Sequence, residues 1–286
     1  MVRWTEHEIP IAGGTLRVRE RDSGPAVLFI HGGLVNGHLW DDVVNQMGGD
    51  IRAIVPDLPL GAHHLPMDPD ADMSFAAMAG RLTEVLDYLD LATVVVVAND
   101  TGGVAAQYLL VEHGDRVSAA MLANIDCYEN FLPKLFFWFP ALMQVPGATW
   151  LVAKLLSTRV GRRLPFTLGL LVRPLNKTEA NLIMGPMWTN SGTRLDLKRW
   201  AKTLKKKQTL ALAKQFKTYQ GPVHIAWTDK DVIFSPKYAD RLATDFPGGV
   251  RLEPITNSKS LSPLDQPGEV ADRLRDLIEA MEPATE

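Results

Sequence analysis

The apolar positions of the chain form short continuous runs, separated by longer stretches in which apolar residues recur every three or four positions. Short runs without alternation are typical of strands buried on both faces of a parallel sheet. They lie at 26–30, 51–55, 94–97, 119–123, 223–227 and 250–255. An alternating pattern at 15–20 predicts one further, half-buried strand.

Helical spacing fills several of the intervals between these runs. Residues 74–89 repeat apolar side chains at helical spacing and begin with Ser74, a residue type that caps helices. Residues 104–112 and 268–281 predict two more helices, the first directly after a pair of glycines. Strands that alternate with helices predict an α/β fold with a mainly parallel central sheet and helices on both faces.

Ligands of such sheets bind beyond the carboxyl ends of the strands. The loops that can carry a site are therefore those that follow the predicted strands. They begin after His31, Val55, Ala98, Ala123, Trp227 and Ile255.

The composition narrows the class of protein. The chain has 286 residues, of which 46% are apolar, and this suits one large domain, or one domain with a big insertion, rather than a disordered chain. Its formal net charge of −3 argues against a general nucleic-acid-binding protein. The single cysteine, Cys127, excludes a disulfide framework and a Cys-rich zinc site and suits a reducing cytosol.

We therefore expect a cytoplasmic protein that needs no cofactor and has no metal site, since no group of His, Cys and acidic residues has the spacing of metal ligands. Residues 1–8 are polar and contain no apolar signal segment. No apolar stretch reaches the roughly 18 residues that a membrane-spanning helix needs, so we expect no stable membrane insertion.

The charge is unevenly distributed along the chain. Residues 131–220 hold 16 Lys and Arg but two acids, whereas the rest of the chain holds 14 bases and 31 acids. The same segment is rich in aromatic residues and is bounded by Pro133 and by Gly221-Pro222. It is either a basic lobe docked on an acidic one, or a surface for an anionic substrate or a membrane.

A candidate catalytic carboxylate lies where the run at 94–97 meets the following helix. Small residues two positions before and two after Asp100 permit the sharp turn of a nucleophile elbow, which holds one side chain above the sheet. The usual elbow is Gly-x-Ser-x-Gly, but here Ala98 replaces the first glycine and Asp100 the serine. The N-terminus of the following helix would stabilise a carboxylate or an oxyanion. The alternative is that Asp100 only caps that helix.

Three strand-end motifs together resemble the α/β-hydrolase superfamily. They are His-Gly-Gly-Leu at 31–34, Pro-Asp-Leu-Pro at 56–59 and Ala-Asn-Asp-Thr-Gly at 98–102. The resemblance covers nearly the whole chain and implies a core of residues 1–130 and 221–286, with 131–220 as an inserted helical cap. An Asp at the elbow is similar to the haloalkane dehalogenase and epoxide hydrolase branch, in which the Asp attacks carbon and a His-activated water cleaves the resulting ester.

The resemblance also implies the other site residues. The oxyanion hole would use the backbone N–H groups of Thr101 and of Gly33 or Leu34. The acid of the triad would be Asp231, with Asp229 as a nearby competitor. Asn99, next to Asp100, is a further candidate binding residue.

The catalytic histidine of the family is absent. Ser260 occupies its position, and His224, the last histidine, lies near the start of its strand, at the wrong end of the sheet. A serine hydroxyl has no useful basicity near pH 7. Three interpretations follow: the base comes from elsewhere, Asp100 transfers protons in a lyase or cyclase reaction, or the protein binds a ligand without catalysis.

Three side chains are candidate substitutes for the missing histidine. His63 is the preferred base because it lies in the loop after the second buried run, and His38 is the second candidate. Lys259, close in sequence to the histidine position, could pair with a carboxylate or act as a base.

The expected substrate is a small apolar organic molecule. Trp138, with Trp150 and Trp188, is expected to line the cap over Asp100. Gly33 and Thr101 occupy the positions from which dehalogenases of this branch offer side-chain N–H groups to the halide, and they have none to offer. Tyr219 and Tyr128 are the tyrosines available to polarise an epoxide. The sequence therefore favours a hydrolase-superfamily enzyme whose reaction stays open.

Overall fold

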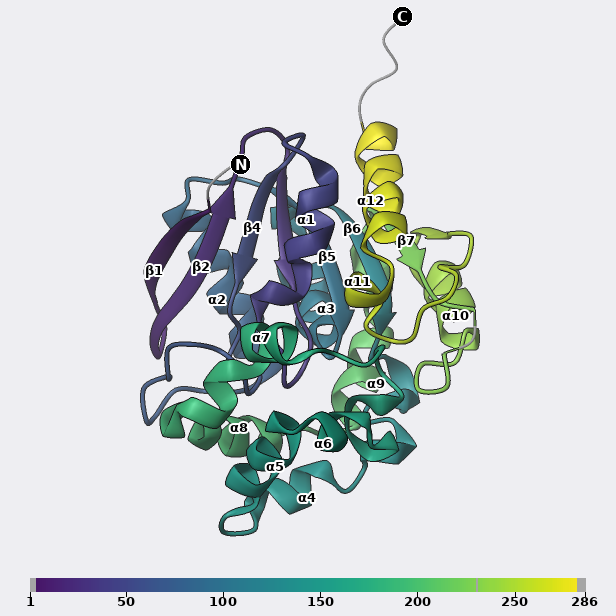
Figure 1. Ribbon diagram of the computed structural model, residues 1–286. Coiled ribbons are helices and arrows are strands. Elements are labelled where there is room, and N and C mark those ends of the chain that lie inside the picture. The colour runs from purple at the N-terminus through teal and green to yellow at the C-terminus, as the bar shows by residue number, and fades with distance from the viewer. Residues whose placement is uncertain (1–3, 230, 282–286) are drawn as a thin grey trace, which may run out of the picture.

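The computed structural model describes residues 4–229 and 231–281, and its centre is an eight-stranded sheet (Figure 1). The spatial order is β1-β2-β4-β3-β5-β6-β7-β8. β1 pairs with β2, and β2 with β4, in antiparallel fashion, and the strands from β4 through β3 to β8 are parallel. The strands are β1 (Thr5–Ile11), β2 (Gly14–Arg21), β3 (Ala26–Ile30), β4 (Arg52–Pro56), β5 (Val94–Asp100), β6 (Val117–Ile125), β7 (Pro222–Ala226) and β8 (Gly248–Arg251).

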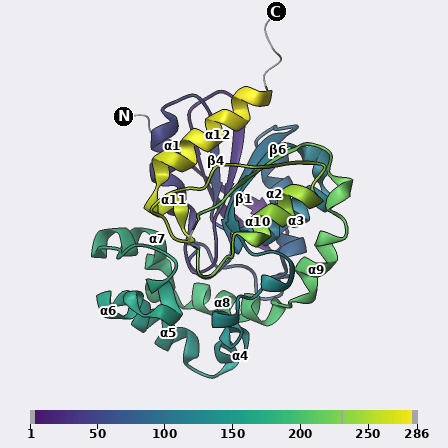
Figure 2. The ribbon, with the colours of Figure 1, turned by 90° about the vertical axis from the view of Figure 1, so that its right-hand side faces the viewer.

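Helices cover both faces of this sheet, as the sequence predicts (Figure 2). One face carries α1 (Asp41–Met47) and α12 (Pro267–Met281), and the other carries α2 (Phe75–Tyr88), α3 (Gly102–Glu112) and α10 (Lys237–Asp245). Successive residues of β3 point to opposite faces, so Val27 and Phe29 join the core under α1 and α12, and Leu28 joins the core under α2 and α3.

A helical segment is inserted between β6 and β7, two strands that pair directly with each other. We call residues 131–220 the cap segment. Most of its helices lie beyond the carboxyl ends of the strands (Figure 1). They are α4 (Phe139–Gln144), α5 (Ala148–Ser157), α6 (Arg159–Arg163), η5 (Pro165–Gly169), α7 (Lys177–Thr189) and α8 (Ser191–Thr203). The last helix, α9 (Lys207–Ala213), instead packs against α3 and the core.

Short helical turns complete the chain. They are η1 (Gly37–Trp40), η2 (Gly114–Arg116), η3 (Tyr128–Asn130), η4 (Lys134–Phe136), η6 (Phe216–Thr218) and α11 (Ser262–Asp265). No helix within residues 4–229 and 231–281 is long and apolar enough to cross a membrane.

The sequence pattern misses one strand and misplaces another. β1 is not predicted because it is an edge strand with mostly exposed polar side chains, and only Ile9 and Ile11 enter the core. β8 ends at Arg251, earlier than the predicted run at 250–255, and Ile255 forms only an isolated bridge with Thr228. The polar start of the chain lies partly outside the described residues, which begin at Trp4.

The start of α3 packs directly on the end of β3, and this contact requires a glycine. A Cβ atom at Gly102 would collide with the backbone carbonyl of His31, whereas one at Gly80, inside α2, would meet nothing within 4 Å. We expect Gly102→Ala to lower the free energy of unfolding by about 1–3 kcal/mol through overpacking. Gly80→Ala is the matched control and should raise it by up to about 1 kcal/mol, because alanine favours helix. Equal urea-denaturation curves for the two variants would contradict the contact.

Candidate active site

The site is built around the turn that joins β5 to α3. Asp100, the last residue of β5, has a φ of 55°, which lies in the left-handed region that residues with a side chain rarely adopt. Thr101 follows, and α3 begins at Gly102. A Cβ atom at Gly32 would overlap the Asp100 side chain, so this glycine lets the loop after β3 approach the turn closely. The geometry is that of a nucleophile elbow.

The carboxyl group of Asp100 is held by neutral donors. The Gly33 N–H donates to Oδ2 at 3.0 Å, and the Thr101 hydroxyl lies 3.3 Å from the same oxygen. Burial raises the pKa of Asp100 to about 6, although hydrogen bonds from the backbone N–H groups of Thr101 and Gly33 act in the opposite direction. Asp100 is therefore mostly ionised at neutral pH, with a pKa close below that pH.

The oxyanion donors follow the resemblance with one correction. Gly33 and Thr101 direct their N–H groups toward the Asp100 carboxyl. The N–H of Leu34 instead donates to the Leu60 carbonyl at 2.9 Å, so it is not free to bind an oxyanion. Leu34 contributes only to the cavity wall.

A cavity of about 230 Å³ lies between Asp100 and the cap segment. Gly33, Asp100 and Thr101 contribute to its core side. The side formed by the cap segment is almost entirely apolar. Its residues include Leu132, Trp138, Phe139, Leu155, Trp200 and Leu204. Such a cavity accepts a small apolar molecule and offers it few polar contacts.

A second carboxyl group, which the sequence reading missed, also lines this cavity. Asp126 directly follows β6, is 2% exposed, and its backbone N–H donates to the Asp100 carbonyl at 3.2 Å. Burial, and then the charge of Asp100, raise the pKa of Asp126 well above its ordinary value. The loop after Ala123 is one of the strand-end loops in which the sequence predicts a site, and this prediction was the signal that pointed to Asp126.

The Ser260 hydroxyl takes the place expected for the histidine beside Asp231. It donates to Asp231 Oδ1 at 2.9 Å. The backbone N–H groups of Ile233 and Phe234 donate to the same oxygen, and Asn124 Nδ2 donates to Oδ2 at 2.7 Å. Burial raises the pKa of Asp231, and these bonds oppose the rise. Asp231 is thus fully hydrogen-bonded and does not line the cavity.

Asn99 does not point into the cavity either. Its Nδ2 donates to the carbonyls of Ala123, at 2.6 Å, and of Ser260, at 2.9 Å. The side chain is fully buried and joins β5, β6 and the loop that carries Ser260. Its role is to fix this loop rather than to bind a ligand.

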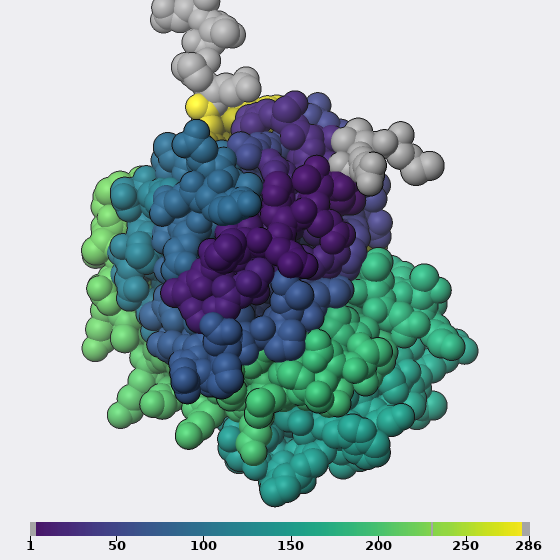
Figure 3. All heavy atoms as spheres, turned by 90° about the vertical axis from the view of Figure 1, so that its left-hand side faces the viewer, coloured from purple at the N-terminus to yellow at the C-terminus, as the bar shows by residue number. Residues whose placement is uncertain are grey.

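The structure does not bring His63 to Asp100. Its Nε2 lies 3.1 Å from Asp196 Oδ2, on α8, and its carbonyl accepts a hydrogen bond from the Thr193 hydroxyl at 3.0 Å. His63 is 1% exposed and does not line the cavity. The pair joins the loop after β4 to the cap segment, whose green atoms lie against the blue atoms of that part of the core in Figure 3. The prediction that His63 acts as the base is therefore wrong, because its ring does not reach the cavity.

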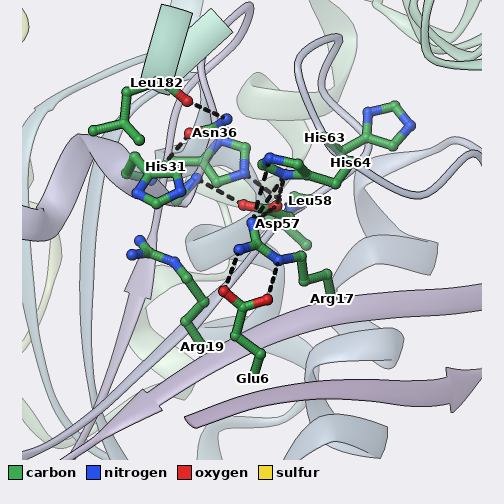
Figure 4. A network of polar contacts seen from close by, with 12 residues as sticks. Glu6, Arg17, Arg19, His31, Asn36, Asp57, Leu58, His63, His64 and Leu182 are labelled. Carbon is green, nitrogen blue, oxygen red and sulfur yellow. Dashed lines mark hydrogen bonds and ion pairs between the residues drawn. The ribbon is translucent and has the colours of Figure 1, made fainter. Parts of the chain in front are cut away.

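His38 adjoins a polar network around the loop after β3, in which Figure 4 shows His31, Asp57 and His64. Its Nδ1 lies 2.7 Å from Asp41 Oδ2, and its ring packs edge-on against His64. In the same network His31 Nδ1 donates to the Gly32 carbonyl, and Nε2 accepts the Leu58 N–H at 2.9 Å. Burial lowers the pKa of His31 to about 4, so this ring is neutral. The network shapes the loop and supplies no base to the cavity.

Lys259 is also remote from Asp100. Its exposed side chain donates through Nζ to the carbonyl of Gly169 at 2.6 Å, so it ties the loop after β8 to the cap segment. It does not line the cavity. Lys259 therefore neither pairs with Asp100 nor acts as its base, contrary to the prediction from the sequence.

The aromatic predictions are only partly matched. Trp138 lines the cavity, but Trp150 is 54% exposed and Trp188 packs on the core. Tyr219 donates to the Val117 carbonyl and Tyr128 to Asp245, so neither reaches the cavity to polarise an epoxide.

Trp200 presents carbon rather than nitrogen to the elbow. Its atom nearest to a Cβ built at Gly33 is Cη2, at 3.0 Å, followed by Cζ3. These atoms form the edge of the ring opposite to the N–H group. Its Nε1 has no hydrogen-bond partner among the described residues. Trp200 therefore turns carbon atoms toward Gly33, while its N–H group is buried without a partner in the described part of the chain.

In the described part of the chain, no group of three or more His, Cys, Asp or Glu side chains is arranged to hold a metal ion.

Comparison with known proteins gives matches of three kinds. The family model described as alpha/beta hydrolase fold matches residues 25–260. A haloalkane dehalogenase of Mesorhizobium japonicum is 35% identical over 111 residues, so the aligned part spans only 35% of that relative and 38% of this chain. An uncharacterized protein of Mycobacterium tuberculosis is 30% identical over 281 residues, which cover 92% of this chain and 77% of that protein.

A solved structure shows the same fold. The crystal structure of haloalkane dehalogenase DbeA from Bradyrhizobium elkani superposes with a TM-score of 0.80 and covers 99% of this chain and 100% of its own. The identity is 19%, so this likeness concerns the fold alone.

Replacement of Asp100 should change stability in a pH-dependent way. Because its pKa in the folded protein is about 6 against an ordinary 3.8, the folded protein binds more protons between these values, and its stability falls as pH rises through them. We expect Asp100→Asn to raise the free energy of unfolding at pH 8 by at most about 3 kcal/mol. The gain should shrink toward zero at pH 4. A loss of stability at pH 8, measured by urea denaturation, would contradict the dominance of burial.

His63→Ala should behave as a structural variant. It removes a hydrogen-bond partner of the buried Asp196 carboxylate, so we expect the free energy of unfolding to fall by about 1–3 kcal/mol. The rate of any reaction at Asp100, measured well below the unfolding temperature, should change little. Accumulation of an ester on Asp100 in this variant alone would restore His63 as the base.

Proposed function

The chain belongs to the α/β hydrolase fold family, and we propose that it is a hydrolase of the dehalogenase-like branch that attacks a small apolar molecule through the carboxylate of Asp100. The observation that carries this proposal is the position of Asp100. It stands on a left-handed elbow on the core side of an apolar cavity, with Oδ2 held by the Gly33 N–H at 3.0 Å.

This arrangement supports covalent catalysis. Because the hydrogen bonds fall on Oδ2, Oδ1 is the oxygen available to attack an electrophilic carbon. The new C–O bond forms as the bond to the leaving atom breaks and its electron pair departs with that atom. The product is an ester of Asp100, whose carbonyl oxygen stays near the N–H groups of Gly33 and Thr101.

Water completes the cycle by attacking the carbonyl carbon of that ester. The two N–H groups stabilise the oxyanion that forms, and collapse of the tetrahedral intermediate releases an alcohol and the Asp100 carboxyl. This step needs a base, which none of His63, His38 and Lys259 supplies to the cavity.

A second candidate is proton transfer by Asp100 without a covalent bond, as in a lyase or cyclase. The observation in its favour is the pKa of about 6, which lies close to the value that suits a general acid or base at neutral pH. The two functions differ in whether an oxygen of Asp100 is exchanged.

Single turnover in ¹⁸O water distinguishes them. With the enzyme in excess over a haloalkane, an epoxide or an activated ester, we expect ¹⁸O in the peptide that contains Asp100, because water attacks the acyl carbon. Asp100→Asn should lower turnover by at least about 1,000-fold. Asp70→Asn, at an exposed position, is the control and should keep it. Turnover with label in the product but none in Asp100 would favour proton transfer. Binding without turnover in either protein would favour a ligand-binding protein.

A further inference from the structure

The proposed function leaves two chemical tasks without a residue. A leaving oxygen would need a proton, and the ester would need a base to activate water. Ser260, at the histidine position, donates its hydroxyl to Asp231 and has no basicity to offer. Among the described residues that line the cavity, the acidic and basic side chains are those of Asp100 and Asp126.

We propose that Asp126 is the general acid and general base of this site, and that it takes the place of the absent histidine. The inference rests on the proposed function, in which Asp100 forms an ester. Asp126 would first donate its proton to the leaving atom and then, as a carboxylate, take a proton from the attacking water.

The geometry of Asp126 suits both tasks. Its backbone is fixed, because its N–H donates to the Asp100 carbonyl at 3.2 Å and its carbonyl accepts Gln107 Nε2 at 2.7 Å. The side chain is 2% exposed and lines the cavity, and Oδ1 has no hydrogen-bond partner in the described part of the chain. A buried carboxyl oxygen without a partner calls for an explanation, and a hydrogen bond to a molecule in the cavity would supply one.

Two carboxyl groups that line the same apolar cavity do not readily ionise together. Asp100 has the Gly33 and Thr101 N–H groups to stabilise its charge. Asp126 has little of this support: burial and the Asp100 charge raise its pKa, and only the Thr101 side chain opposes the rise. The pair therefore divides into an ionised nucleophile, Asp100, and a protonated acid, Asp126.

The presence of a protonated Asp126 beside an ionised Asp100 indicates which kind of leaving atom the site suits. A halide leaves without a proton and leaves faster when N–H donors stabilise it, and the Trp200 edge near Gly33 consists of carbon atoms. An oxygen in a strained ring leaves as an alkoxide unless it is protonated, so a proton donor speeds its departure. The site therefore suits an apolar epoxide. Asp126 would protonate the epoxide oxygen, because neither Tyr128 nor Tyr219 reaches the cavity to polarise it.

One turnover then consists of ester formation at Asp100 followed by hydrolysis of the ester. Asp100 Oδ1 attacks a ring carbon, the C–O bond breaks, and the ring oxygen takes the proton of Asp126 to give a hydroxy ester. The Asp126 carboxylate removes a proton from water as the water oxygen attacks the ester carbonyl. Collapse breaks the ester C–O bond, and the departing oxygen takes that proton from Asp126. The Asp100 carboxyl proton returns to Asp126 through the Thr101 hydroxyl, which contacts both groups, and the net reaction is epoxide plus water to diol.

Two probes separate the acid role from the base role. Styrene oxide opens faster when an acid protonates its oxygen, whereas benzyl bromide alkylates a carboxylate without an acid. With styrene oxide, we expect Asp126→Asn to slow ester formation at Asp100 by about 100-fold or more, as measured by intact mass after rapid quenching. With benzyl bromide, the same variant should be esterified at the wild-type rate, which also shows that its site is folded. The base role is tested with the styrene oxide ester, because its formation leaves Asp126 as a carboxylate: this ester should persist in the variant where the wild type removes it.

The controls make the failures distinguishable. Cys127→Ala alters the neighbouring buried residue, which does not line the cavity, and should match the wild type with both probes. If Asp126→Asn behaves like Cys127→Ala while reaction still depends on Asp100, the role of Asp126 is overturned and the proposed function stands. If neither probe modifies Asp100 in the wild type and turnover survives in Asp100→Asn, the proposed function falls and this inference falls with it.

Discussion

The burial of a carboxyl group without a cation is the constraint on which the candidate site depends. Asp100 is 8% exposed and its hydrogen-bond donors are the neutral groups of Gly33 and Thr101. These donors stabilise the charge enough for ionisation near neutral pH, but not enough to make the carboxylate inert. Their positions depend on the left-handed turn at Asp100 and on the close approach of the loop after β3, which Gly32 permits. The fold thus raises the pKa of this carboxyl group by restricting its solvation.

Polar links between the core and the cap segment hold the cap segment in its place over Asp100. Asn36 donates to the Leu182 carbonyl on α7, and His63 pairs with Asp196 on α8. Lys259 donates to the Gly169 carbonyl at the end of η5. Two of these side chains resemble candidate bases when only the sequence is considered, but in the structure they hold the cap segment over Asp100. The opposite charges of the cap segment and the core favour the same contact.

Local pattern was sufficient for the features that depend on neighbours in sequence. The buried runs correspond to strands, Ser74 caps α2 through the Ala77 N–H, and the elbow was evident from the small residues around Asp100. The placement of Ser260 at the histidine position followed from the resemblance, and the structure adds its hydrogen bond to Asp231. The directions of loop side chains were less predictable. The sequence around His63 does not indicate that its ring turns toward α8, because its partner there, Asp196, lies 133 positions away.

Asp126 was missed for a different reason. β6 continues to Ile125, two residues beyond the apolar run, so the strand end that carries Asp126 lay outside the expected one. The resemblance also directed attention to the position of the absent histidine. In the structure, that position has become part of the support for Asp231, whose carboxyl accepts bonds from Ser260, Asn124 and two backbone N–H groups. A buried acid supported in this way no longer needs a histidine, and the proton chemistry can pass to a carboxyl group on the neighbouring strand.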